Sequence, residues 1–138
     1  MTESQIQTIK ASWQIFRSID PELVGDVFYT HLFQDYPQLK ALFTTSREIQ
    51  SVKLVNMLHI IVSRIDRMDE LKPEIEALGI RHIRYGVKPM HYEAVVNALL
   101  WTLQTGIGAE WNEEVKDAWQ TCYNEVATIM MQAMATAL

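Results

Sequence analysis

The sequence predicts an all-α fold of six main helices, and three observations support this. Apolar residues recur at spacings of three and four nearly from end to end, which is the period of an amphipathic helix. No segment shows the alternation of apolar and polar residues that is typical of a strand. Prolines and glycines stand between the periodic segments, where helices begin and end. Residues 1–138 are therefore expected to form one helical domain.

The first three helices each have a start signal. Ser4 can cap the first helix. Asp20-Pro21-Glu22 combines a capping carboxylate, a first-turn proline and an acid at the positive end of the dipole. Pro37 ends this second helix and opens a short turn, and residues 45–48 fit a capping box for the third helix. The inward residues are predicted to be Ile6, Ile9, Trp13, Phe16; Val24, Val27, Phe28, Tyr29, Leu32, Phe33; and Gln50, Leu54, Met57, Leu58, Ile61, Ile65.

Three further helices are expected in the second half of the chain. Leu71-Lys72-Pro73 begins the fourth, which ends near Gly86. Pro89 begins the fifth, and the glycines at 106 and 108 close it. Asn112 caps the last helix. Their inward residues are predicted to be Leu71, Ile75, Leu78, His82, Tyr85; Tyr92, Val95, Val96, Leu99, Leu100, Leu103; and Val115, Trp119, Cys122, Val126, Ile129, Ala133.

Composition excludes several classes of function. The net charge is -5, and lysines and arginines are scattered, so nucleic-acid binding is not expected. Cys122 is the single cysteine, which excludes an internal disulfide, a Cys-rich zinc site and a Cys-x-x-Cys-His haem attachment. No apolar stretch approaches the ~20 residues of a membrane span, and no signal peptide is visible. A cytoplasmic protein without a membrane segment is expected.

Three polar residues stand on apolar helix faces. They are His82, Tyr29 and Gln50. Each alone has an ordinary explanation: a satisfied core histidine, a core tyrosine bonded to a backbone carbonyl, and a solvated glutamine at a helix margin. Together they would be costly to bury without a partner. A haem would be such a partner, because its iron binds one imidazole and a gas on its other face accepts hydrogen bonds.

The other three histidines are weaker metal-ligand candidates. At about 100° per residue, His31 lies about 200° around the helix from Tyr29. His59 lies about half a turn away from Gln50 by the same arithmetic. His91 stands at a helix start, where capping or solvent explains it. His82 alone belongs to a continuous apolar stripe, so it is the best candidate ligand.

The order and spacing of these residues form a longer pattern. The matching pieces are Phe28-Tyr29, Pro37, Leu42-Phe43, Gln50, Leu54, Arg81-His82, Gly86-Val87 and His91-Tyr92. This pattern resembles a globin over essentially the whole chain, and Phe43 with His82 is its most specific part. The chain is most similar to bacterial single-domain, three-over-three globins. Gln50 follows Phe43 by only seven positions, so the small fourth helix of vertebrate globins is expected to be absent or minimal.

The resemblance implies a non-covalent haem b with His82 as the metal ligand. Tyr29 and Gln50 would donate hydrogen bonds to the bound gas. The other expected cofactor-binding residues are Phe43, Lys53, Leu54, Met57, Leu78, Val87, Tyr92, Val95 and Val126. Arg47, Lys53 and Arg84 are plausible partners of the haem propionates. Glutamine is a poor iron ligand, so the resemblance to a Tyr/Gln globin favours a site open to gases.

One position departs from the flavohaemoglobin pattern. Those globins use a tyrosine and a last-helix glutamate to polarise the proximal histidine, whereas this chain offers Tyr92 and Met134, with Glu125 nine residues earlier. The favoured function is reversible, high-affinity oxygen binding for storage, delivery or scavenging, with carbon monoxide and nitric oxide as further ligands. The alternatives are nitric oxide dioxygenation or nitrite reduction with an external reductase, and gas sensing. A monomer or weak dimer is expected.

Overall fold

The computed structural model describes residues 1–84 and 86–137, except for the side chain of Arg84. These residues form six α-helices joined by short turns, and none of them belongs to a strand. The helices are α1 (Glu3–Trp13), α2 (Pro21–Asp35), α3 (Arg47–Ser63), α4 (Met68–Arg84), α5 (His91–Ile107) and α6 (Glu113–Ala137). The predicted all-α class and its six main helices are confirmed for this part of the chain.

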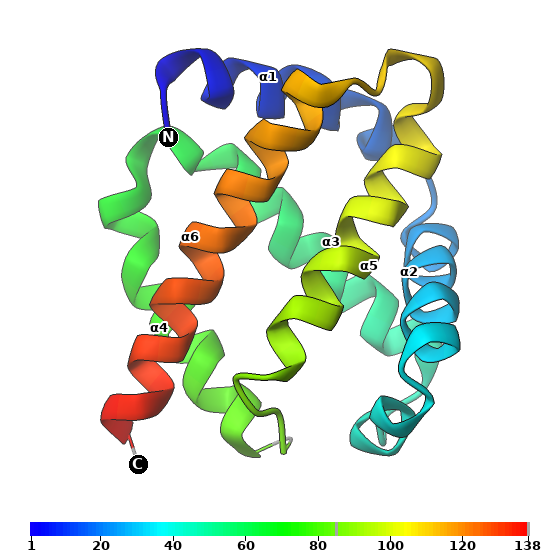
Figure 1. The fold of residues 1–138 in the computed structure, drawn as a ribbon, viewed down its shortest axis with the longest axis vertical. Helices are drawn as coiled ribbons and strands as arrows, with labels where there is room; N and C mark the ends of the chain where they lie inside the picture. The colour runs from blue at the N-terminus through cyan, green and yellow to red at the C-terminus, as the bar shows by residue number, and fades with distance from the viewer. Residues whose placement is uncertain (85, 138) are drawn as a thin grey trace.

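The helices cross one another in layers (Figure 1). The α5 and α6 helices lie side by side at the front, α3 runs behind them, and α1 lies across the top of the molecule. The α6 helix packs on α1, α4 and α5, while α2 packs on α3 and α5. The last turn of α4 and the first turn of α5 both lie at the end of the molecule opposite α1 (Figure 1).

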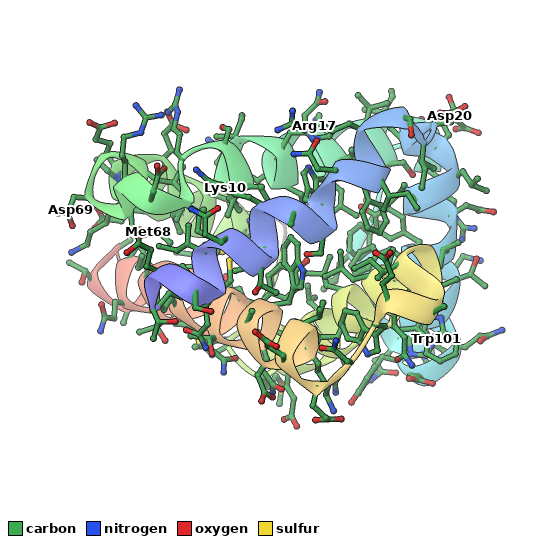
Figure 2. All side chains as sticks on the ribbon, turned by 90° about the horizontal axis from the view of Figure 1, so that it is seen from above. Lys10, Arg17, Asp20, Met68, Asp69 and Trp101 are labelled. Atoms are coloured by element: carbon green, nitrogen blue, oxygen red, sulfur yellow. The ribbon has the colours of Figure 1, made fainter. Side chains whose placement is uncertain are left out.

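The core is filled most completely beneath α1, which covers this end of the molecule (Figure 2). Trp13, Phe16 and Trp119 are at most 2 % exposed, and the Trp13 and Phe16 rings stack with centroids 4.9 Å apart. Many of the apolar side chains that pack against the core are only half-buried. They include Leu42, Phe43, Leu54, Met57, Leu78, Ile83, Val87 and Val95.

The predicted starts of α1 and α4 were wrong by a few residues. The α1 cap is Thr2 and not Ser4, because Thr2 and Gln5 exchange hydrogen bonds between side chain and backbone in a reciprocal capping box. The α4 helix begins at Met68, about one turn before Leu71. Asp69 and its acidic neighbour favour that earlier start. Pro73 therefore lies inside the helix, in its second turn, where it cannot donate a backbone hydrogen bond to Asp69.

The predicted caps at Asp20 and Asn112 are confirmed, whereas α5 begins at His91, two residues after the predicted Pro89. Asp20 accepts a hydrogen bond from the Glu22 backbone, and Asn112 accepts one from Val115. Ser46 caps α3 by accepting a hydrogen bond from the Ile49 backbone, so the capping box predicted for residues 45–48 does not form, because Ile49 and not Glu48 stands three positions after the cap. Pro37 opens a 3-10 turn that ends at Leu42.

The connection between the turn Pro37–Leu42 and α3 is short. No helix lies between residues 43 and 46, so the predicted absence of the small fourth helix is confirmed. Tyr85, which we predicted to face inward, lies outside the described residues. Within the described ranges, no helix is long and apolar enough to cross a membrane.

Candidate functional site

A close helix crossing positions the first two candidate residues. A Cβ atom added to Gly25 of α2 would lie 2.8 Å from the Cα atom of Ser51 on α3, so only a glycine fits here without movement. Tyr29 follows Gly25 by one helical turn, and Gln50 precedes Ser51 directly. The crossing therefore holds Tyr29 and Gln50 beside each other.

Tyr29 is buried among aromatic rings. Its ring centroid lies 5.3 Å from that of Phe43 and 5.8 Å from that of Phe33. Its hydroxyl is 3.5 Å from the backbone oxygen of Gln50, a long and therefore weak hydrogen bond that leaves the O–H able to turn to another acceptor. Burial raises the pKa of Tyr29 to about 12, although the charge of Arg47 opposes this shift. The phenol is therefore a neutral O–H donor near neutral pH.

A cavity of about 170 Å³ opens beside this hydroxyl. Its walls are Tyr29, Phe33, Lys40, Phe43, Thr45, Arg47 and Gln50. Sequence reasoning missed Phe33, Lys40 and Thr45 as site residues. Phe33 could have been found, because it follows Tyr29 by four positions and shares its helix face. Lys40 and Thr45 lie outside the α-helices, where helical periodicity gives no direction.

His82 lies on α4 and is half-buried. Its Nδ1 atom is 2.7 Å from the carbonyl oxygen of Leu78, which confirms the predicted bond to a backbone carbonyl. Burial lowers the pKa of His82, and the charge of Arg81 adds to this, while the Leu78 bond opposes it. The ring is therefore neutral near pH 7. With Nδ1–H donating to Leu78, the nitrogen that can bind a metal is Nε2.

The other histidines have contacts that explain them. His31 stacks on Trp101 with ring centroids 4.7 Å apart. His59 accepts a hydrogen bond of 2.8 Å from the indole N–H of Trp13. His91 accepts a backbone hydrogen bond of 3.0 Å at the start of α5. These contacts explain the positions of the three histidines without a metal.

Tyr92 and Met134 meet on the α5 and α6 helices. The Tyr92 hydroxyl donates to the Met134 sulfur at 3.1 Å, so Met134 faces Tyr92 as predicted. A thioether is a weak acceptor, and burial raises the pKa of Tyr92 to about 12. Glu125, the carboxylate that the sequence left as an alternative, accepts a bond of 2.9 Å from the amino group of Met1.

The remaining predicted residues come from several helices. Leu54 and Met57 on α3, Leu78 on α4, Val95 on α5 and the nearby Val87 are half-buried, and Val126 on α6 is buried. Lys53 is exposed on α3. The propionate role predicted for Arg84 falls on a side chain outside the described part. A larger cavity of about 630 Å³, walled by α2, α5 and the start of α6, is lined by none of the residues predicted to bind the cofactor or its gas ligand.

These residues fit a flat, apolar, metal-containing group. Phe43, Leu54, Leu78 and Val95 are half-buried apolar side chains of the kind that such a group would cover. Within the described ranges, no group of three histidine, cysteine or acidic side chains could hold a metal ion. The types of side chain present, one neutral imidazole, a phenol and an amide, are those that a haem with a gas ligand needs, although His82 does not line the cavity beside Tyr29 and Gln50.

Comparison with known sequences gives relatives over nearly the full chain. The globin family profile matches residues 26–130. An uncharacterised globin-like protein of Aquifex aeolicus is 31% identical over 131 residues, covering 95% of this chain and 92% of that protein. A leghemoglobin of Canavalia lineata is 28% identical, with 99% and 97% covered. An anaerobic nitrite reductase of Arabidopsis thaliana is also 28% identical, with 96% and 93% covered.

Solved structures show the same arrangement of helices. An engineered carbene transferase of Rhodothermus marinus superposes with a TM-score of 0.89 at 25% identity, covering 99% of this chain and 95% of its own. A bacterial globin of Campylobacter jejuni gives a TM-score of 0.84 at 25% identity, covering 99% and 98%. Fold, profile and relatives agree, and the chain belongs to the globin family.

Proposed function

We propose that this chain holds one haem b without a covalent bond and binds dioxygen reversibly with high affinity. The observation that carries this proposal is the buried, neutral hydroxyl of Tyr29 beside Gln50, set in half-buried apolar walls. When bound, haem iron supplies a coordination position for diatomic gases such as dioxygen, carbon monoxide and nitric oxide. The leghemoglobin among the relatives supports the same reading.

His82 would be the protein ligand of the haem iron. Its Nδ1–H donates to the Leu78 carbonyl, which sets both the tautomer and the ring orientation. The low pKa keeps the ring neutral, so no proton has to leave before a metal binds. The apolar walls would come from Phe43, Leu54, Met57, Leu78, Val87, Val95 and Val126, with Tyr92 beneath and Lys53 near the propionates.

Tyr29 and Gln50 would set the affinity for the gas. The pKa of about 12 keeps the proton on Tyr29, so the phenol is available as a donor. A hydrogen bond to an acceptor that carries charge contributes ~1.5–3 kcal/mol. Two such bonds would slow oxygen release by about two to four decades, at 1.4 kcal/mol per decade. Carbon monoxide is less polar and would gain less. Because an amide is a poor iron ligand, Gln50 would leave the gas position open.

A second candidate function is the turnover of nitrite or nitric oxide with an external reductase. It is supported by the anaerobic nitrite reductase among the relatives and by Lys40 and Arg47 in the cavity wall. Reduction of the ferric protein by cellular reductants, followed by sustained consumption of nitrite or nitric oxide, would favour this candidate over simple oxygen binding.

The decisive experiment is absorption spectroscopy of the purified protein in ferric, ferrous, oxygen-bound and carbon-monoxide-bound forms. We expect a Soret band that shifts with each ligand. His82→Ala should weaken haem retention and change the ferrous spectrum, whereas His91→Ala, which alters only a helix-start contact, should leave both unchanged. Retention of wild-type haem affinity by His82→Ala would show that the ligand assignment is wrong.

A further inference from the structure

The larger cavity, of about 630 Å³, shares no wall residue with the cavity beside Tyr29. Trp101 of α5 forms part of its wall and is 47% exposed, and Figure 2 shows this residue at the edge of the molecule. The half-buried Trp111, in the connection between α5 and α6, also lines the cavity. Tryptophan is enriched among the residues that contribute most to contacts between proteins. The larger cavity is therefore a candidate contact surface.

Trp101 is held in one orientation before any partner binds. The His31 ring from α2 stacks on its indole, with centroids 4.7 Å apart and ring planes 12° from parallel. His31 is itself positioned by Asp35, whose carboxylate lies 3.3 Å from Nε2. An aromatic side chain that is already ordered loses little conformational entropy when a partner covers it. His31 covers one face of the indole, so the opposite face can contact a partner.

The exposure of the wall favours a protein over a small molecule. Asn97, Trp101, Gln104, Asn112 and Glu113 are all exposed wall residues. A small molecule would keep much of its surface in water there, whereas small-molecule sites bury ~70–90% or more of the ligand surface. A second protein surface would cover both indoles and the polar wall together.

The wall is complementary to itself, which selects a second copy of this chain as the partner. Its groups occur in matching pairs, which are the indoles of Trp101 and Trp111, the carboxamides of Asn97 and Gln104, and the opposite charges of Glu113 and Lys116. Among the described contacts, neither charge takes part in an ion pair. A two-fold axis through the cavity exchanges the members of each pair, so the acid of each protomer faces the base of the other. A partner surface of a single charge sign would instead place like charges together.

We propose that the larger cavity is the interface of a two-fold symmetric homodimer, in which Trp101 of each protomer enters the cavity of the other. Glu113 of each protomer then pairs with Lys116 of the other. The inference goes beyond the proposed function and does not depend on it, because the wall contains no residue assigned to haem or gas. The wall has nine residues, fewer than the roughly 20–30 a side of a stable interface. We therefore expect a weak dimer that exchanges with the monomer.

The first test is the dissociation constant of the dimer, measured by analytical ultracentrifugation of the haem-loaded protein from micromolar to millimolar concentration. Trp101→Ala should raise this constant by about ten-fold or more, because the symmetry removes two tryptophan anchors at once. Leu23→Ala is the matched control, since Leu23 is an apolar residue of α2 that is 59% exposed and lies outside the wall. It should leave the constant unchanged. The unfolding temperature of each variant reports whether the fold is intact.

The second test exchanges the two charges. Glu113→Lys and Lys116→Glu should each raise the dissociation constant by about three- to ten-fold, because each places like charges together at two points of the interface. Mixed in equal amounts, the two variants should form a heterodimer about as tight as the wild-type dimer, since every contact again joins opposite charges. Glu114→Lys is the control, because Glu114 is an exposed acid in the same first turn of α6 but outside the wall. It should behave as the wild type.

Three outcomes would overturn the dimer interface. A chain that stays monomeric up to millimolar concentration has no such interface. An unchanged constant in Trp101→Ala would place the dimer contact on another surface. Two weakened single variants whose mixture gains no affinity would show that the charges act within α6 and not between protomers. Oxygen and carbon monoxide binding by the same samples tests the proposed function separately, because the two cavities share no wall residue.

Discussion

Burial raises the pKa of Tyr29 and of Tyr92 to the same value, but the two hydroxyls have different hydrogen-bond partners. Both have a pKa raised to about 12 by loss of solvent, so both keep their protons near neutral pH. Tyr92 is engaged by the Met134 sulfur at 3.1 Å, whereas the Tyr29 hydroxyl has only a 3.5 Å contact with a backbone oxygen. Tyr29 therefore has the weaker internal partner and is the better placed to bind a ligand.

Replacing Tyr29 by phenylalanine should raise the oxygen dissociation rate by about ten-fold or more. The lost bond is worth ~1.5 kcal/mol or more, and the phenyl ring keeps the contacts with Phe33 and Phe43. Stopped-flow oxygen release measures this effect, with Gln50→Leu as the second variant. The carbon monoxide dissociation rate should change less in both. Unchanged oxygen rates in the two variants would contradict the assignment of these donors.

His82 should behave as an ordinary neutral imidazole. Its Nδ1–H is bonded to a carbonyl and not to a carboxylate, and Tyr92 contacts the thioether of Met134, a weak acceptor. Resonance Raman spectroscopy of the deoxy ferrous form measures the iron–histidine stretch directly. We expect a frequency below the imidazolate range and feeble peroxidase activity. A high, imidazolate-like frequency would show that a carboxylate reaches the ring.

Sequence reasoning reached the residues that belong to a periodic helix face. His82, Tyr29 and Gln50 could be selected because each interrupts an apolar stripe, and Met134 could be placed opposite Tyr92 by resemblance. Lys40 could not be selected, because its turn has no periodicity to orient it. The ion-pair partner of Arg47 could not be predicted either, since Asp26 lies 21 positions away and an exposed ion pair leaves no pattern in a single sequence.

At the scale of helices, the α2–α3 crossing is the contact that positions the site. Ser51 is fully buried at this crossing, and its hydroxyl has no hydrogen-bond partner in the described structure. The backbone of Gly25 lies so close to Ser51 that a larger side chain at position 51 would not fit. The close approach of the two helices therefore leaves one buried hydroxyl without a hydrogen bond, which costs stability.

Gly25→Ala should destabilise the protein by about 1–3 kcal/mol, because the added methyl group overlaps Ser51 and forces the helices apart. Ser51→Gly in the same variant should restore part of this loss by removing the facing side chain. Urea unfolding measures both changes in the free energy of unfolding. The oxygen dissociation rate should also rise in Gly25→Ala, because Tyr29 and Gln50 move apart. Full stability in the single variant would show that the crossing is loosely packed.

Helix existence was easier to predict than helix starts. Asp20 and Asn112 cap their helices as expected, because a capping side chain followed by an acidic first turn leaves few alternatives. Ser4 was a wrong choice, since Thr2 offers the same hydroxyl with Gln5 at the position that completes a capping box. Pro73 suggested a late start for α4, but the helix begins at Met68 with an acidic first turn and contains Pro73 in its second turn.

Across the whole molecule, α1 is tied to distant helices by two indole N–H groups. Trp13 donates to His59 on α3, and Trp119 on α6 donates to Ser12 at 2.9 Å. The bonded residues are separated by 46 positions in the first pair and by 107 in the second. Helical periodicity placed the two tryptophans inward but gave no partner for either N–H, because such pairs depend on how helices cross. These bonds hold the filled end of the core together.

The Trp13–His59 bond should make stability depend on pH. Nδ1 of His59 can accept the indole proton only while it is unprotonated, and burial, together with the charge of Arg17, lowers the pKa of His59 below 6.5. A histidine whose pKa is lowered by folding contributes its full stability above 6.5, and this stability is lost as the pH falls through that value toward the pKa of the folded state.

His59→Gln keeps an acceptor for Trp13 without a titrating ring. The thermal unfolding temperature of the wild-type protein should therefore fall more steeply between about pH 7.5 and pH 5 than that of His59→Gln. His91→Gln, which removes an exposed helix-start contact, should retain the wild-type steepness. Both variants keep His82, so its own titration cancels in the comparison, and parallel curves for all three proteins would show that this bond does not govern the acid sensitivity of the fold.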